Sequence, residues 1–120
     1  MTLDETRAGL ASSYEALDEW SREAKDPWIL RKGLARVYGR LDSDERQLAD
    51  VVISEWVLSR DARHQVAAQY IIREFCIREA IPALRRRVRQ LAGETGGPAR
   101  DEREIVEQLI SDLRDDVTPR

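Results

Sequence analysis

The chain has 120 residues, of which 42% are apolar and 36% charged, with a formal net charge of −3 and a single cysteine. This length suits one domain covering residues 1–120. The high charged share excludes a membrane protein, a collagen and, together with the apolar share, a disordered chain. One cysteine excludes a disulfide framework.

The compartment is predicted from the N-terminus and from the longest apolar run. The N-terminus is acidic and lacks the apolar region of a signal peptide. The run from Val51 to Leu58 is interrupted by Ser54 and Glu55, and it is far shorter than the ~20 residues that span a bilayer. We therefore expect a cytoplasmic protein without a membrane partner. The 18 arginines against 2 lysines are typical of GC-rich bacterial codon usage.

The first half of the chain predicts three helices, over about 3–24, 27–41 and 43–59. Thr2 and Glu5 have the spacing of a capping box at the start of the first helix. Asp26 precedes a proline and caps the second helix. Asp42 and Glu45 repeat the capping-box spacing at the start of the third helix, which is apolar around most of its circumference.

The second half predicts three further helices, over about 61–76, 78–92 and 101–115. Asp61 is placed to cap the fourth helix, and Gly93 fits a C-terminal cap of the fifth. A glycine-rich loop is expected over 93–100. Asp101 then opens a last helix whose apolar stripe is narrow and one-sided, as suits a terminal element.

The six helices predict an all-α fold of three stacked antiparallel hairpins. The hairpins cover about 3–41, 43–76 and 78–115. Their spacing of roughly 35 to 40 residues falls near the range of helical-repeat solenoids, for which three repeats are about the minimum.

Two adjoining segments resemble HEAT-like repeat proteins. In Ser59–Ile72 a short polar turn with Asp61 precedes a helix with small residues at its middle, which is similar to the second helix of such a repeat. Phe75–Leu84 contains the run E-A-I-P-x-L and resembles the junction between repeats. The resemblance covers about 59–91. It implies stacked helix pairs in a family whose members mostly bind other macromolecules, and it brings no catalytic residues.

The side chains needed for metal binding and catalysis are scarce. His64 is the only histidine, and Cys76 is the only cysteine, whereas a zinc site needs three or four ligands. We expect His64 to be partly exposed and Cys76 to be a small buried hydrophobe. There is no glycine-rich phosphate loop. The sequence therefore predicts no metal, no cofactor and no enzyme activity.

A basic strip is the sharpest surface feature. Residues 60–92 carry eight basic and three acidic side chains, while the segments on both sides are acidic. The functional interpretation is a strip that binds phosphates or an acidic protein patch. The alternative is neutralisation by acidic residues of the last helix, such as Glu102, Glu107 or Asp112. The strip consists of Arg78, Arg85, Arg86, Arg87 and Arg89.

These features predict a non-enzymatic protein–protein interaction module. Trp28 lies beside a helix turn and joins the candidate partner-binding residues, because tryptophan and arginine are favoured at interface hot spots; core packing is its alternative. A nucleic-acid-backbone binder that uses Arg85–Arg89 and a toxin-immunity or inhibitor protein stay open as alternatives. A homodimer also stays open.

Overall fold

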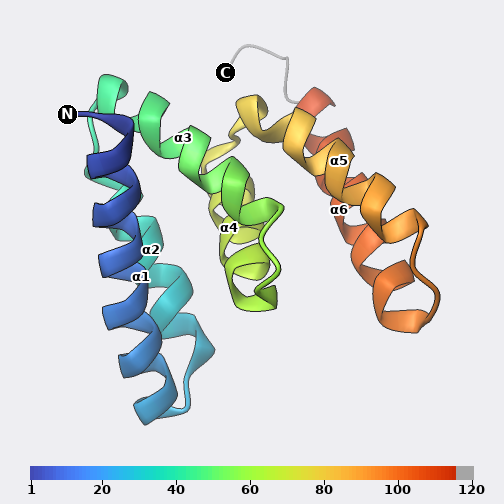
Figure 1. Ribbon diagram of the computed structural model, residues 1–120, viewed down its shortest axis with the longest axis horizontal. Coiled ribbons are helices and arrows are strands. Elements are labelled where there is room, and N and C mark those ends of the chain that lie inside the picture. Colours follow the sequence, from blue (N-terminus) through green and yellow to red (C-terminus); the bar gives the residue numbers. More distant parts are fainter. Residues whose placement is uncertain (116–120) are drawn as a thin grey trace. The chain divides into compact units, whose positions relative to one another are not determined.

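The computed structural model describes residues 1–115, and within this range the chain is helical with no strand. No helix in this range is both long enough and apolar enough to cross a membrane. The predicted all-α class with six helices is confirmed. In chain order (Figure 1) the elements are α1 (Leu3–Ala24), α2 (Pro27–Gly39), α3 (Ser43–Val57), α4 (Ala62–Phe75), the 3₁₀ turn η1 (Arg78–Ala80), α5 (Ile81–Ala92) and α6 (Gly97–Asp115).

Local capping explains where the helices of the first half begin. The Thr2 hydroxyl accepts a hydrogen bond from the Glu5 backbone N–H, and the Glu5 carboxylate accepts one from the Thr2 N–H, both at 3.2 Å. Asp42 and Glu45 make the same reciprocal pair at 2.8 and 3.1 Å. Each pair satisfies two donors that have no partner inside the helix. The capping boxes predicted at Thr2 and Asp42 are thus present, whereas the third capping-box spacing, at Asp101 and Glu104, does not mark the start of a helix.

The start of α6 differs from the sequence prediction. The helix begins at Gly97 rather than near Asp101, so the expected loop over 93–100 is wrong in its second half. Gly96 has a φ of 121°, a conformation that glycine adopts without strain. Pro98 then falls in the first turn of α6, where its missing N–H costs no helical hydrogen bond. The first turn is completed by Arg100 N–H donating to the Gly96 carbonyl at 3.3 Å.

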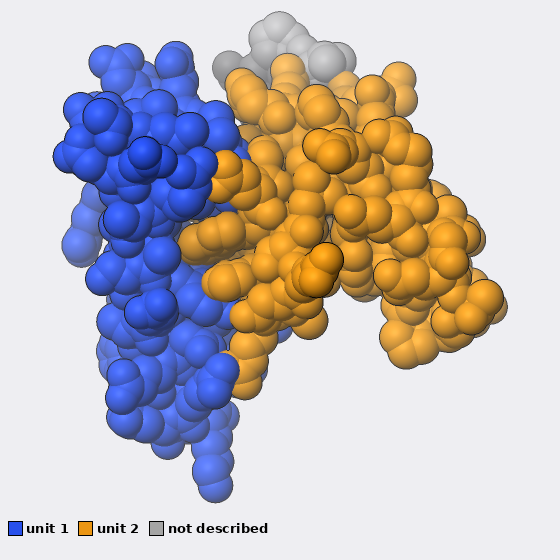
Figure 2. All heavy atoms as spheres, in the orientation of Figure 1, with its two compact units in different colours: residues 1–53 blue, residues 54–120 orange. Residues whose placement is uncertain are grey.

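The chain forms two compact units, Met1–Ile53 and Ser54–Arg120 (Figure 2). In the first unit, α1 and α2 pack side by side as a helical hairpin (Figure 1). A Cβ atom at Gly33 of α2 would lie 2.5 Å from Cδ2 of Leu17 of α1. Glycine therefore permits the two helices to approach this closely.

In the second unit, α5 packs along α6, and α4 also contacts α6. The core is built from one face of each of these helices. Its largest fully or almost fully buried side chains are Ile71, Ile72, Leu84, Leu91, Val106, Leu109 and Leu113.

The end of α4 places Cys76 in an unexpected setting. Cys76 is exposed rather than buried, so the expectation of a small buried hydrophobe is wrong. It is the C-cap of α4 with a φ of 52°, and its N–H donates to the Ile72 carbonyl. A residue in this left-handed position ends the helix, and the side chain is turned out of the α4 stripe.

Candidate interaction surface on α5 and α6

Helix α5 carries four arginines and no acidic residue. Successive residues of an α-helix are rotated by about 100°, so these arginines cannot all lie on one face. With the buried Leu84 as the inner reference, Arg87 lies on one flank of the helix. Arg85 and Arg89 lie one turn apart on the opposite flank, and Arg86 points away from the core. The structure thus divides the predicted strip into three parts.

Arg87 is engaged inside the unit. Its Nε donates to Oε2 of Glu102 at 2.8 Å, and its Nη2 donates to Oε1 at 2.9 Å. Further hydrogen bonds reach Gln90 at 3.2 Å and Gln65 at 3.3 Å. Only 12% of the Arg87 side chain is exposed. The hydrogen bond to the Glu102 carboxylate raises the pKa of Arg87, although burial lowers it in part.

Arg87 therefore joins α4, α5 and α6 through side-chain hydrogen bonds. For Arg87 the alternative interpretation of the strip therefore holds, because this arginine is paired with an acidic residue of the last helix. A residue held in this way is a structural connection rather than a free cation for a partner.

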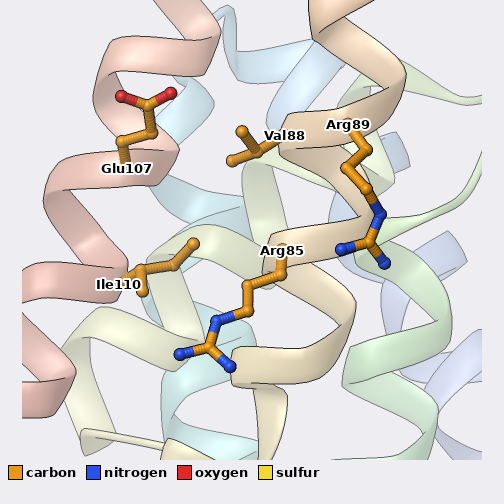
Figure 3. Close-up of a pocket in the computed structure, with 5 residues that line it drawn as sticks. All are labelled: Arg85, Val88, Arg89, Glu107 and Ile110. Carbon is orange, nitrogen blue, oxygen red and sulfur yellow. The ribbon is translucent and has the colours of Figure 1, made fainter.

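Arg85 and Arg89 belong to an open hollow between α5 and α6. Its lining consists of Arg85, Val88 and Arg89 from α5, with Glu107 and Ile110 from α6, and its volume is about 280 Å³ (Figure 3). Val88 and Ile110 are half-buried and form its apolar floor. We call this feature the α5–α6 hollow.

The charges on the two rims of the hollow are different. Arg85 and Arg89 are exposed on the α5 rim, and neither makes an ion pair within residues 1–115. Glu107 on the α6 rim is 3.7 Å from Nε of Arg103, one turn earlier on its own helix. Arg85 and Arg89 are like charges four residues apart, an arrangement that destabilises a helix by about 0.2–0.5 kcal/mol. The α5 rim therefore holds two neighbouring cations whose charge the described residues do not neutralise.

The remaining predicted residues lie outside the hollow. Arg78 of η1 and Arg86 of α5 are both exposed and line no part of it. Trp28 belongs to the first compact unit and is 47% exposed. The Arg31 Cζ lies 5.0 Å from the centroid of the Trp28 ring, and the Lys32 Nζ lies 6.0 Å from it.

Sequence reasoning missed the floor of the hollow. Val88 and Ile110 both fit the apolar stripes of their helices, and the stripe pattern assigned them to the core. The residues beside Val88 in sequence give no signal of its exposure, because Leu113 also lies between two charged residues and is only 2% exposed. Only the packing of α5 against α6 shows that both side chains reach the surface.

A second depression, on α4 and α6, has a lining of mixed charge. Arg73, Asp101, Glu104, Ile105 and Gln108 line it. Its only arginine lies 3.5 Å from Asp112, which compensates the charge. Asp101 and Glu104 add negative charge, so this depression is acidic on balance and contains none of the predicted arginines.

His64 has a structural setting. Its ring stacks on Trp56, with centroids 5.2 Å apart and planes 25° apart. Its Nδ1 lies 3.4 Å from Ser59 Oγ and 3.7 Å from Asp61 Oδ2. The side chain is 28% exposed, which agrees with the expected partial exposure. Within residues 1–115 no three potential metal ligands gather in one place.

Comparison with known proteins gave no family model, no curated protein and no solved structure that matches the chain. The resemblance of residues 59–91 to HEAT-like repeats stays a prediction. Function is therefore inferred from the α5–α6 hollow and its charges.

Proposed function

We propose that the chain is a non-enzymatic protein–protein interaction module, a HEAT-like helical repeat of a cytoplasmic, bacterial-type protein. Its partner binds on the α5–α6 surface. The observation that supports this is the α5–α6 hollow, which combines an apolar floor with Arg85 and Arg89, two arginines that make no ion pair with other residues of the range 1–115. Protein interfaces have this composition, with an apolar centre, a polar rim and frequent arginine. Complementary charge on the partner would orient it and speed its association.

The same surface favours a protein over a nucleic-acid backbone. Phosphate binding needs a series of cations that neutralise successive phosphates. Arg87 is paired with Glu102, which interrupts the series on α5. Glu107 adds a negative charge to the opposite rim, and the apolar floor gives nothing to a phosphate. The nucleic-acid alternative would have to use Arg78 and Arg86 as much as the residues of the hollow.

The test is affinity capture from a nuclease-treated lysate of the native host with three forms of the protein. The first is the wild type, and the second is the double variant Arg85→Glu/Arg89→Glu. The matched control is Arg86→Glu, which reverses an exposed arginine of the same helix outside the hollow. We expect one defined set of proteins on the wild type and the control, and its loss from the double variant.

Two results would contradict the proposal. In the first, nuclease treatment removes every captured protein, which would show that nucleic acid holds them. In the second, the double variant retains the same proteins as the wild type, which would place any docking site elsewhere on the chain.

A further inference from the structure

The size of the α5–α6 hollow limits what it can hold. Its volume is about 280 Å³ and it is open to solvent, whereas pockets for small molecules have roughly 300–1,000 Å³ and enclose most of the ligand. A free metabolite would stay largely hydrated here. A single side chain of a docked segment would fit, because the rest of the segment stays outside the hollow.

The floor selects the type of side chain. Val88 and Ile110 are both aliphatic and half-buried, and covering them removes apolar surface from water. Among the residues that the structure describes, no aromatic and no amide side chain lines the hollow. An aliphatic side chain is therefore the best match.

The α5 rim selects the charge of the segment. Arg85 and Arg89 are four residues apart, which is about 6 Å along the helix axis. Carboxylates four residues apart on a helix have a similar separation, and so do carboxylates two residues apart on an extended strand. Each arginine can pair with one of them through its planar guanidinium group.

The α6 rim favours one side of the hollow for the acidic groups of the segment. The carboxylate of Glu107 lies across the hollow from the two arginines (Figure 3). Acidic groups of a bound segment are favoured on the α5 side, and they are repelled on the α6 side. A uniformly anionic ligand such as a phosphate backbone meets both rims and gains less.

We propose that the α5–α6 hollow binds a short acidic segment of a protein partner. One aliphatic side chain of that segment covers Val88 and Ile110, and two carboxylates pair with Arg85 and Arg89. This inference rests on the proposed function and names the chemistry of the partner at the same site.

The test is a selection from a display library of random peptides of about 12 residues on the immobilised full chain. Peptides that bind the support without the chain are removed by counter-selection. We expect the remaining peptides to carry acidic residues two or four positions apart, with a Leu, Ile or Val beside them. The enriched peptide is then synthesised, and its affinity is measured by fluorescence anisotropy.

Four variants test the contacts one by one, with circular dichroism as the check of folding. The Arg85→Glu/Arg89→Glu variant should bind the peptide about tenfold more weakly or worse, because two exposed ion pairs are reversed. Arg86→Glu should change the affinity less than about twofold. Val88→Thr keeps the shape of the floor but adds a hydroxyl, and it should weaken binding several-fold. Glu107→Gln should strengthen binding about twofold, a gain that damage to the fold would not produce.

The outcomes that overturn the inference are distinct from those that overturn the proposed function. Hollow-dependent peptides without carboxylates or without an aliphatic residue would refute the acidic segment and leave the module in place. Selection of no peptide, or only of peptides that bind the double variant equally well, would refute the inference.

Two other occupants give their own signatures, and each would refute the inference. A second copy of this chain would make the wild type dimeric and the double variant monomeric in light scattering. A random DNA duplex that binds the wild type and loses affinity equally in Arg85→Glu and Arg86→Glu would indicate a phosphate backbone.

Discussion

Replacing Arg87 by alanine tests whether this arginine is a structural connection of the second unit. The variant removes two short hydrogen bonds to Glu102, at 2.8 and 2.9 Å, and two longer ones to Gln90 and Gln65. Hydrogen bonds to charged groups contribute about 1.5–3 kcal/mol each. Breaking one partner of a fully buried ion pair costs about 3–5 kcal/mol. The Glu102 side chain is 26% exposed, so water replaces part of what is lost.

We therefore expect Arg87→Ala to lower the free energy of unfolding by about 2–3 kcal/mol. Urea denaturation followed by circular dichroism measures this change. With a slope of about 2 kcal/mol/M, the midpoint should fall by about 1–1.5 M. A double-mutant cycle with Glu102→Ala should give a coupling energy of about 1–2 kcal/mol.

The pH dependence has a defined sign. The folded state raises the pKa of Arg87, so the stabilisation is complete below the ordinary pKa of arginine and is lost only as the pH rises through the raised value. The contribution of the Arg87 titration should therefore be the same at about pH 6 and pH 9.

The control is Arg86→Ala, which removes an exposed arginine from the next position of the same helix. It should change stability by less than about 0.5 kcal/mol. Equal effects of the two alanine variants on the free energy of unfolding would refute the structural role of Arg87. Arg87 would then count among the arginines of the basic strip that are available to a partner.

Four further substitutions test features of the helices by urea denaturation. Gly9→Ala should stabilise the protein by about 0.5–1 kcal/mol, because a Cβ at this position meets no atom within 4 Å. Gly33→Ala should bring no gain, since its Cβ would collide with the Leu17 side chain of α1. An equal gain in stability at both positions would contradict the close packing of α1 and α2. Tyr38→Phe should cost about 1.5 kcal/mol because it removes the 2.6 Å hydrogen bond to Asp50, and an unchanged midpoint would show that this bond adds nothing. Cys76→Gly should stabilise the end of α4 by about 0.5–1 kcal/mol, since glycine adopts a positive φ without strain; destabilisation would refute this explanation of the cap.

The helical class and most helix boundaries follow from the sequence because their causes are local. Thr2 and Asp42 cap the helices that begin directly after them, and each cap needs only residues within one turn. The start of α6 was misplaced because Asp101 and Glu104 have the spacing of a capping box, although the helix begins four residues earlier, at Gly97. The helix starts at Gly97 because Gly96 adopts a positive φ, a conformation that a glycine in the sequence permits but does not require.

The candidate site was only partly predictable for a different reason. The sequence by itself determined that α5 is rich in arginine and has no acidic residue of its own, which concentrates positive charge on one helix. It could not decide which arginine keeps a free charge, because the decisive partner of Arg87, Glu102, is 15 residues away on another helix. Packing of α5 against α6 made that choice and left Val88 at the surface between the two rims. Charge content is a property of the chain, whereas compensation of charge depends on distances that only the tertiary structure sets.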